Sequence, residues 1–253
     1  MPLPRVVSRD HRLMATLSGK TVLVIGGSSG IGHEIARQAR AEGAELTITG
    51  RDAQRLAMAA EDLGGLEAIQ LDAHDETALG HLFTERPPVD HMVSMVGDSM
   101  AGGFLSTTPE TMRHVLHSKF WTNWMIGRHA PSALVAGGSL TFTAGTGGRA
   151  QDGSAAYVAN LGVGALVEGL AYELAPDRRV NAVAPTFMGA RTRFWSDVPT
   201  DELDKQQAGF SQRVPLQRLG TVAEVASTYI HLLTNTFING RVLAVDGGVM
   251  LDK

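Results

Sequence analysis

A glycine-rich segment near the N-terminus has the composition to bind a phosphate group. Residues 25–32 read IGGSSGIG, directly after an apolar run and directly before an amphipathic stretch. In a strand–turn–helix unit, one glycine permits a tight turn, a second lets the backbone approach a pyrophosphate, and a third allows close packing of the helix. The helix N-terminus also offers free N–H groups and a positive dipole end to the phosphates. We therefore predict a dinucleotide site with contacts from Gly26, Ser28, Ser29, Gly30, Ile31 and Gly32.

The residues after the second apolar run indicate which dinucleotide is bound. An NAD site usually has an acid at the end of this strand, where it holds the ribose 2′-hydroxyl. Residues 47–51 read TITGR, and Arg51 can instead hold a 2′-phosphate with paired N–H donors. The sequence therefore predicts NADP(H) rather than NAD(H). We expect the adjacent Asp52 to cap the next helix, and His33, which could also approach the phosphate, to be an exposed helix residue.

Several motifs along the chain together resemble those of the short-chain dehydrogenase/reductase family. The glycine turn is similar to the family's T-G-x-x-x-G-x-G, with Ile25 in the threonine position. The other matches are LD at residues 71–72, RVNAVAP at 179–185, RLG at 218–220 and DGG at 246–248. The resemblance covers residues 17–248 and implies a nicotinamide cofactor and a homotetramer or homodimer. The further cofactor contacts that it implies are Asp72, Gly97, Tyr157 and Pro185.

The resemblance also implies a Tyr-x-x-x-Lys pair on the long helix after the fifth strand. In the family the phenol passes a proton to or from the substrate carbonyl oxygen, and the lysine lowers the phenol pKa from its usual value near 10. Residues 157–161 read YVANL, so Tyr157 is present but Leu161 stands in the lysine position. The family's helper serine corresponds to Ala144, which cannot hydrogen-bond a carbonyl oxygen. Thr143 or Thr146 could substitute if the loop shifts.

A lysine on the preceding helix could compensate for the missing one. The family's N-x-x-G-x-F pattern is best matched by KFWTNW at residues 119–124, which puts Lys119 in the asparagine position. In the family this side of the helix faces the lysine site. An ammonium group from Lys119 could therefore reach the space left by Leu161 and favour the ionised form of Tyr157. We predict Tyr157 and Lys119 as the catalytic pair; the alternative is that Lys119 is a solvated helix residue.

Three functions are compatible with these residues. The first is an NADP(H)-dependent oxidoreductase acting on a small-molecule ketone or secondary alcohol. The second is an NADP(H)-binding protein without dehydrogenase activity, such as a redox sensor, which the substitutions Ala144 and Leu161 favour. The third is a dehydratase or isomerase that uses the same pocket. A fold alone does not choose among them.

Short apolar runs alternate with amphipathic stretches along the whole chain. This alternation predicts an α/β fold with a single doubly wound Rossmann domain, in which a parallel sheet of about seven strands carries helices on both faces. Residues 19–253 form this domain, residues 1–18 an N-terminal extension, and residues 185–219 an irregular substrate loop or lid. The expected strands are residues 21–25, 46–49, 66–71, 91–96, 139–143, 179–183 and 241–245. The expected helices are residues 31–41, 53–63, 76–83, 109–129, 155–174 and 222–233.

The bulk composition excludes several classes of protein. The chain has 253 residues, a formal net charge of −4 and no cysteine. The charge argues against binding to nucleic acid or to an anionic membrane, and without cysteine there is no disulfide or zinc-thiolate site. No metal site is predicted. We see no stretch near the roughly 18 apolar residues that a membrane span needs and no secretory signal, so we expect a cytoplasmic protein.

Overall fold

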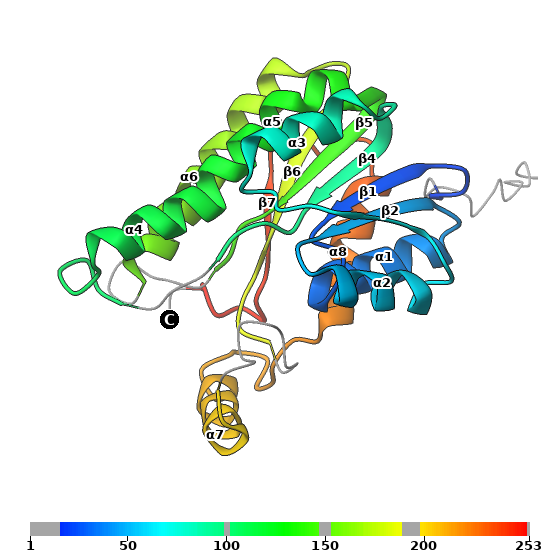
Figure 1. Cartoon of the computed structure of the whole chain (residues 1–253). Coiled ribbons are helices and arrows are strands. Elements are labelled where there is room, and N and C mark those ends of the chain that lie inside the picture. The colour runs from blue at the N-terminus through cyan, green and yellow to red at the C-terminus, as the bar shows by residue number, and fades with distance from the viewer. Residues whose placement is uncertain (1–15, 99–101, 147–152, 189–197, 252–253) are drawn as a thin grey trace, which may run out of the picture.

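A single parallel sheet forms the centre of the molecule (Figure 1). The computed structural model describes residues 16–98, 102–146, 153–188 and 198–251. Its seven strands pair in parallel in the order β3-β2-β1-β4-β5-β6-β7, which confirms the predicted fold class. The strands are β1 Thr21–Ile25, β2 Glu45–Gly50, β3 Glu67–Gln70, β4 Val89–Ser94, β5 Leu134–Thr143, β6 Arg179–Pro185 and β7 Val242–Val245. The strand order reverses between β1 and β4, and ligands of such sheets bind outside the carboxyl ends of the strands at this point.

Helices cover both faces of the sheet because each central strand is apolar on both sides. Val22 and Val24 of β1 pack with α1 Gly30–Ala41, α2 Ala53–Asp62 and α8 Val222–Thr234. Leu23 and Ile25 of the same strand pack with three other helices. These are α3 Glu76–Thr84, α5 Thr122–Ala133 and α6 Ser154–Glu173. The packed part of the chain reaches back to Leu17, which is buried in the first of these two clusters.

One predicted helix is interrupted. Residues 109–129 form α4 Pro109–Val115 and a π-helical stretch, η1 Leu116–Trp121, before α5 begins. The Thr122 N–H donates to the carbonyl oxygen of His117, five residues earlier, and the Thr122 hydroxyl donates to the same oxygen. Single π turns inside helices often lie at functional sites, and this one contains Lys119.

The segment predicted to be irregular contains a helix. Residues 200–211 form α7 Thr200–Ser211, which stands apart from the sheet layers in Figure 1. Pro199 directly precedes it, and Asp201 and Glu202 lie in its first turn. Proline at a helix start and acids near the N-terminal dipole both favour a helix there. The expectation of irregular structure was therefore wrong for the central part of this segment, whereas its role as a substrate loop or lid stays a prediction. Residues 189–197 of the predicted lid lie outside the described residues.

Helix α6 is long and apolar enough to cross a membrane by length and composition, contrary to the expectation from the sequence. Its residues Val163, Val167 and Ala171 are buried against the sheet. Core helices of globular proteins meet the same criterion, so length and composition alone are weak evidence for a membrane span.

Candidate active site

The glycine turn between β1 and α1 has the geometry expected of a phosphate cradle. The N–H groups of Gly26 and Gly27 both donate to the carbonyl oxygen of Thr49, which ties the turn to β2. A Cβ atom on Gly32 would overlap the carbonyl oxygen of Gly26, so no side chain fits there. Ser29 precedes α1 but makes no side-chain cap hydrogen bond, and the first turn of the helix carries no acid. The N-terminus of α1 is thereby left without a negative group of its own.

Ser28 and Arg51 are both neighbours of Gly50, the last residue of β2. A Cβ atom on Gly50 would lie 2.8 Å from the Ser28 Oγ, so the serine hydroxyl occupies the space beside the strand end. Arg51 follows directly and is exposed. Within the described part of the chain its guanidinium group makes no hydrogen bond or ion pair. The strand end therefore presents a hydroxyl donor and an uncompensated cation.

The two neighbours that could have disturbed this site are engaged elsewhere. Asp52 is the N-cap of α2 and accepts a hydrogen bond from the Arg55 N–H, as predicted. His33 Nε2 lies 3.1 Å from Asp62 Oδ2 at the end of α2.

Asp72 is exposed after β3, and its carboxylate accepts from the His74 N–H.

Lys119 is buried at the carboxyl end of β4. Its side chain is 6% exposed, which overturns the alternative that it is a solvated helix residue. A Cβ atom on Gly97 would lie 2.8 Å from the Lys119 Cγ, so the lysine stem crosses directly over that glycine. No hydrogen bond from the Lys119 Nζ is present among residues 16–98, 102–146, 153–188 and 198–251. Burial lowers the pKa of Lys119 to about 8, and the carboxylate of Asp98 partly opposes that shift.

A buried asparagine that sequence reasoning missed holds the π turn against β4. Asn123 Oδ1 accepts from the Ser94 hydroxyl at 2.6 Å, and its Nδ2 donates to the carbonyl oxygens of Lys119 at 2.6 Å and Val96 at 3.3 Å. The Asp98 N–H donates to the hydroxyl of Ser118 at 3.2 Å and adds a second tie. These contacts fix the backbone of Lys119 relative to the end of β4. The only sequence signal was an asparagine among the aromatic residues of the KFWTNW segment, residues 119–124.

Tyr157 lies in the first turn of α6 and is partly buried. One turn later, Leu161 is 57% exposed, so no charged side chain replaces the family's lysine on this helix. The helix packs against the π turn, where Gly162 lies against the ring of Phe120, next to Lys119. No hydrogen bond links the Tyr157 side chain to Lys119 in the described part of the structure.

The hydroxyls of Thr143 and Thr146, at the described end of β5, are both hydrogen-bonded to neighbouring parts of the protein. Ala144 is 4% exposed. Thr143 Oγ1 donates to the Ser94 carbonyl oxygen at 2.7 Å and is hydrogen-bonded to the Tyr229 Oη of α8 at 2.8 Å. Burial raises the pKa of Tyr229, so this pair is neutral. Thr146 is turned toward Pro185, whose carbonyl oxygen accepts from its N–H at 3.0 Å and from its hydroxyl at 3.4 Å.

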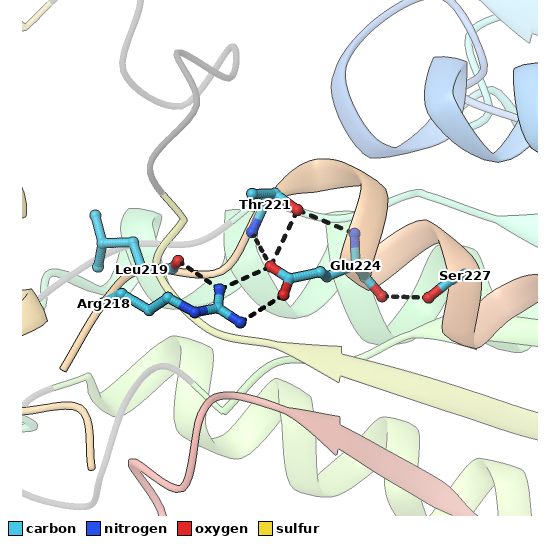
Figure 2. A network of polar contacts seen from close by, with 5 residues as sticks. All are labelled: Arg218, Leu219, Thr221, Glu224 and Ser227. Carbon is cyan, nitrogen blue, oxygen red and sulfur yellow. Dashed lines mark hydrogen bonds and ion pairs between the residues drawn. The ribbon is translucent and has the colours of Figure 1, made fainter. Parts of the chain in front are cut away.

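The chain that returns from α7 is fixed to α8 by an ionic network (Figure 2). Arg218 donates to both carboxylate oxygens of Glu224 at 2.9 and 2.6 Å. The same carboxylate accepts from the Thr221 N–H, and the Thr221 hydroxyl accepts from the Glu224 N–H, which completes a capping box. Hydrogen bonding to Arg218 is the main reason that the pKa of Glu224 is lowered to about 2. The network therefore persists across the physiological pH range.

Comparisons with known proteins agree with this architecture. The family model described as enoyl-(acyl carrier protein) reductase matches residues 25–250. The chain is 30% identical to the short-chain dehydrogenase/reductase ATR9 of Stachybotrys chlorohalonatus, over 94% of this chain and 100% of that protein. It is 31% identical to human 3-oxoacyl-[acyl-carrier-protein] reductase, over 92% and 98% of the two chains. A short-chain type dehydrogenase/reductase structure from Mycobacterium ulcerans superposes with a TM-score of 0.82 at 27% identity, covering 94% of this chain and 92% of that one.

Proposed function

Because this chain belongs to the short-chain dehydrogenase/reductase family, we propose that it transfers hydride between NADP(H) and a ketone or secondary alcohol. The observation that carries the cofactor choice is the end of β2. Gly50 leaves room for the Ser28 hydroxyl, and Arg51 beside it has no anionic partner among the described residues. A 2′-phosphate would supply that partner, whereas the ribose hydroxyl of NAD(H) would not.

The residues present fit a dinucleotide. The backbone of Gly26, Gly30 and Gly32 would hold the pyrophosphate at the N-terminus of α1, whose first turn carries no acid. Ser28 and Arg51 would hold the 2′-phosphate. The other residues that we assign to the cofactor are Ser29, Ile31, Asp72, Gly97, Tyr157 and Pro185. When bound, the nicotinamide supplies the hydride donor or acceptor.

The protein's own contribution to the reaction is proton transfer and orientation. In ketone reduction, the Tyr157 Oη donates a proton to the carbonyl oxygen; in alcohol oxidation, the same oxygen must accept it. We assign to the buried ammonium of Lys119 the role of the family's lysine, whose position Leu161 occupies in this chain. A positive charge within about 4–6 Å favours the ionised phenol, so Lys119 supports the oxidation direction most.

The substrate carbonyl is expected to belong to a molecule with apolar surface. The human relative is named for a 3-oxoacyl group, which is an acyl chain with a ketone at its third carbon. In this chain, Phe187 after β6 and Phe210 on α7 bring their rings to 5.2 Å from centre to centre. Together they offer an apolar wall beside the carboxyl ends of the strands.

Calorimetric titration with NADPH and NADH tests the proposed cofactor. Wild-type protein should bind NADPH more tightly. Arg51→Ala should weaken NADPH binding by about 1–3 kcal/mol, the range for a charge-assisted hydrogen bond, and should barely change NADH binding. Arg55→Ala is the matched control, because Arg55 is a nearby exposed arginine that is paired with Asp52. Equal affinity of the wild-type protein for both cofactors would refute the assignment.

The second candidate is an NADP(H)-binding protein without dehydrogenase activity. Ala144 and the exposed Leu161 favour it, because neither can perform the polar role of the family residue in that position. Tight NADPH binding without turnover of any carbonyl compound would favour this candidate. Formation of a dehydrated or isomerised product would instead favour a dehydratase or isomerase that uses the same pocket.

A further inference from the structure

His74 lies between β3 and α3, among charged groups at the edge of the sheet where the strands end. Its backbone N–H donates to the carboxylate of Asp72 at 3.1 Å. Burial lowers the pKa of its ring, the carboxylates of Asp72 and Asp98 oppose that shift, and the guanidinium of Arg51 adds to it. Charged groups act on a pKa in this way at short range. His74 is therefore a neighbour of two residues assigned to the cofactor, Arg51 and Asp72.

The hydrogen bonds of His74 fix the position of its ring proton. Its Nδ1 lies 2.9 Å from the Thr122 Oγ1, and the Thr122 hydroxyl donates to the carbonyl oxygen of His117. A hydroxyl has only one hydrogen to donate, so it must accept from His74, and Nδ1 must carry the hydrogen. The other nitrogen of the neutral ring, Nε2, then has a free lone pair.

The Nε2 lone pair of His74 is available to a ligand. Across the residues that the structure describes, Nε2 makes no hydrogen bond or ion pair. The ring is only partly buried, and Nε2 is not one of the enclosed side-chain atoms without a partner. A lone pair beside the Asp72 carboxylate disfavours an anion and favours a ligand with an N–H donor.

The proposed dinucleotide has such a donor in the right part of the molecule. The 2′-phosphate that we assign to Arg51 is carried by the ribose that is joined to the adenine. The adenine therefore lies close to whatever holds that phosphate. The 6-amino group is the hydrogen-bond donor of this base, and the groups near Arg51 at the end of β3 are acceptors: the Asp72 carboxylate and the His74 Nε2.

We propose that the His74 Nε2 accepts a hydrogen bond from the 6-amino group of the adenine in the bound dinucleotide. This inference rests on the proposed function. Thr122 is then a positioning residue, because its hydroxyl keeps the proton on Nδ1 and leaves Nε2 as the acceptor. The ligand class is a 6-aminopurine nucleotide. A 6-oxopurine is disfavoured, because it presents a carbonyl oxygen to the same lone pair.

Equilibrium titration compares NADPH with its hypoxanthine analogue, in which an oxygen replaces the 6-amino group. His74→Phe keeps a ring but has no acceptor, so it should weaken NADPH binding about fivefold, the scale of one net hydrogen bond. It should not weaken binding of the analogue. His74→Gln retains an acceptor and should preserve the preference of the wild-type protein for NADPH. His81→Phe is the control, because His81 is an exposed histidine on α3, and it should change neither Kd.

Equal losses for both nucleotides in His74→Phe, or no loss for either, would overturn the proposal, because His74 would then only fill space. NMR of the cofactor-free protein labelled with ¹⁵N-histidine gives an answer that does not depend on binding. The His74 ring, assigned by its absence from the His74→Phe spectrum, should carry its hydrogen on Nδ1, and a hydrogen on Nε2 instead would overturn the proposal. Failure of the wild-type protein to bind either nucleotide would refute the proposed function itself.

Discussion

Lys119 is a buried side chain that carries a charge, and burying a charge lowers the free energy of unfolding. Its pKa is lowered to about 8 in the folded chain, mainly by desolvation, whereas a lysine in an unfolded chain titrates near 10.4. The unfolded chain therefore binds more protons between about pH 8 and 10.4, and the free energy of unfolding rises with pH across this window. Below pH 8 the full cost of the buried ammonium is present.

Lys119→Met should remove this cost, because methionine can follow the lysine stem over Gly97 without a charge. At pH 7 we expect the free energy of unfolding to rise by about 3 kcal/mol, at 1.36 kcal/mol for each unit between a pKa of about 8 and the unfolded value near 10.4. Urea denaturation measures it. The difference from wild type should narrow as the pH rises from 8 to 10. A difference near zero at pH 7 would mean that Lys119 is solvated in solution.

The same variant separates stability from activity. If Lys119 assists Tyr157, Lys119→Met should depress alcohol oxidation more than ketone reduction, because a protonated phenol can still donate but is a poor base. A gain in stability together with a loss of oxidation is the pattern expected of a residue kept for function. Unchanged rates in both directions would remove Lys119 from the catalytic pair.

At the level of single residues, sequence reasoning predicted types and positions better than orientations. Asp52 as a helix cap could be predicted because capping depends on local backbone geometry. The burial of Lys119 could not be predicted, and neither could the hydrogen bond between Thr143 and Tyr229. Both depend on residues that are far away in the chain.

At the level of elements, the π turn and its clamp are the least predictable feature of the site. A π turn shifts the helix face by one residue, and no local pattern in residues 116–121 marks it. Asn123 ties the π turn to the end of β4. Its side chain donates to the carbonyl oxygens of Lys119 and Val96 and accepts from the Ser94 hydroxyl. We infer that this clamp positions Lys119.

Asn123→Ala should therefore destabilise the fold and misplace the lysine. Loss of the amide leaves buried polar groups of β4 and η1 without this partner, and unsatisfied groups of this kind cost about 1–3 kcal/mol each. We expect a decrease of about 2–4 kcal/mol in the free energy of unfolding, measured by urea denaturation. Ser94→Ala is the control, because it removes one of the three hydrogen bonds and should cost less. Equal costs for the two variants would contradict a clamp centred on Asn123.

At the level of the whole molecule, the architecture could be predicted because its signal is distributed along the chain. Successive side chains of a strand such as β1 point to opposite faces of the sheet, and both sets are apolar. Only a sheet that is covered on both sides accommodates this pattern. Helix α7 was missed because its sequence buries only Leu203 and so lacks an apolar stripe. The homotetramer or homodimer stays a prediction, since it depends on contacts between copies of the chain.

We propose that this fold, with Lys119 in place of the family's lysine partner of Tyr157, still transfers hydride from NADPH to a carbonyl carbon. The most direct measurement uses NADPH deuterated at C4 of the nicotinamide, with ethyl acetoacetate, cyclohexanone and butanal as acceptors and mass spectrometry of the products. We expect deuterium on the carbinol carbon of at least one alcohol product, and we expect the Tyr157→Phe variant to form no such product. NADPH that binds tightly but transfers no deuterium to any of the three acceptors would contradict it.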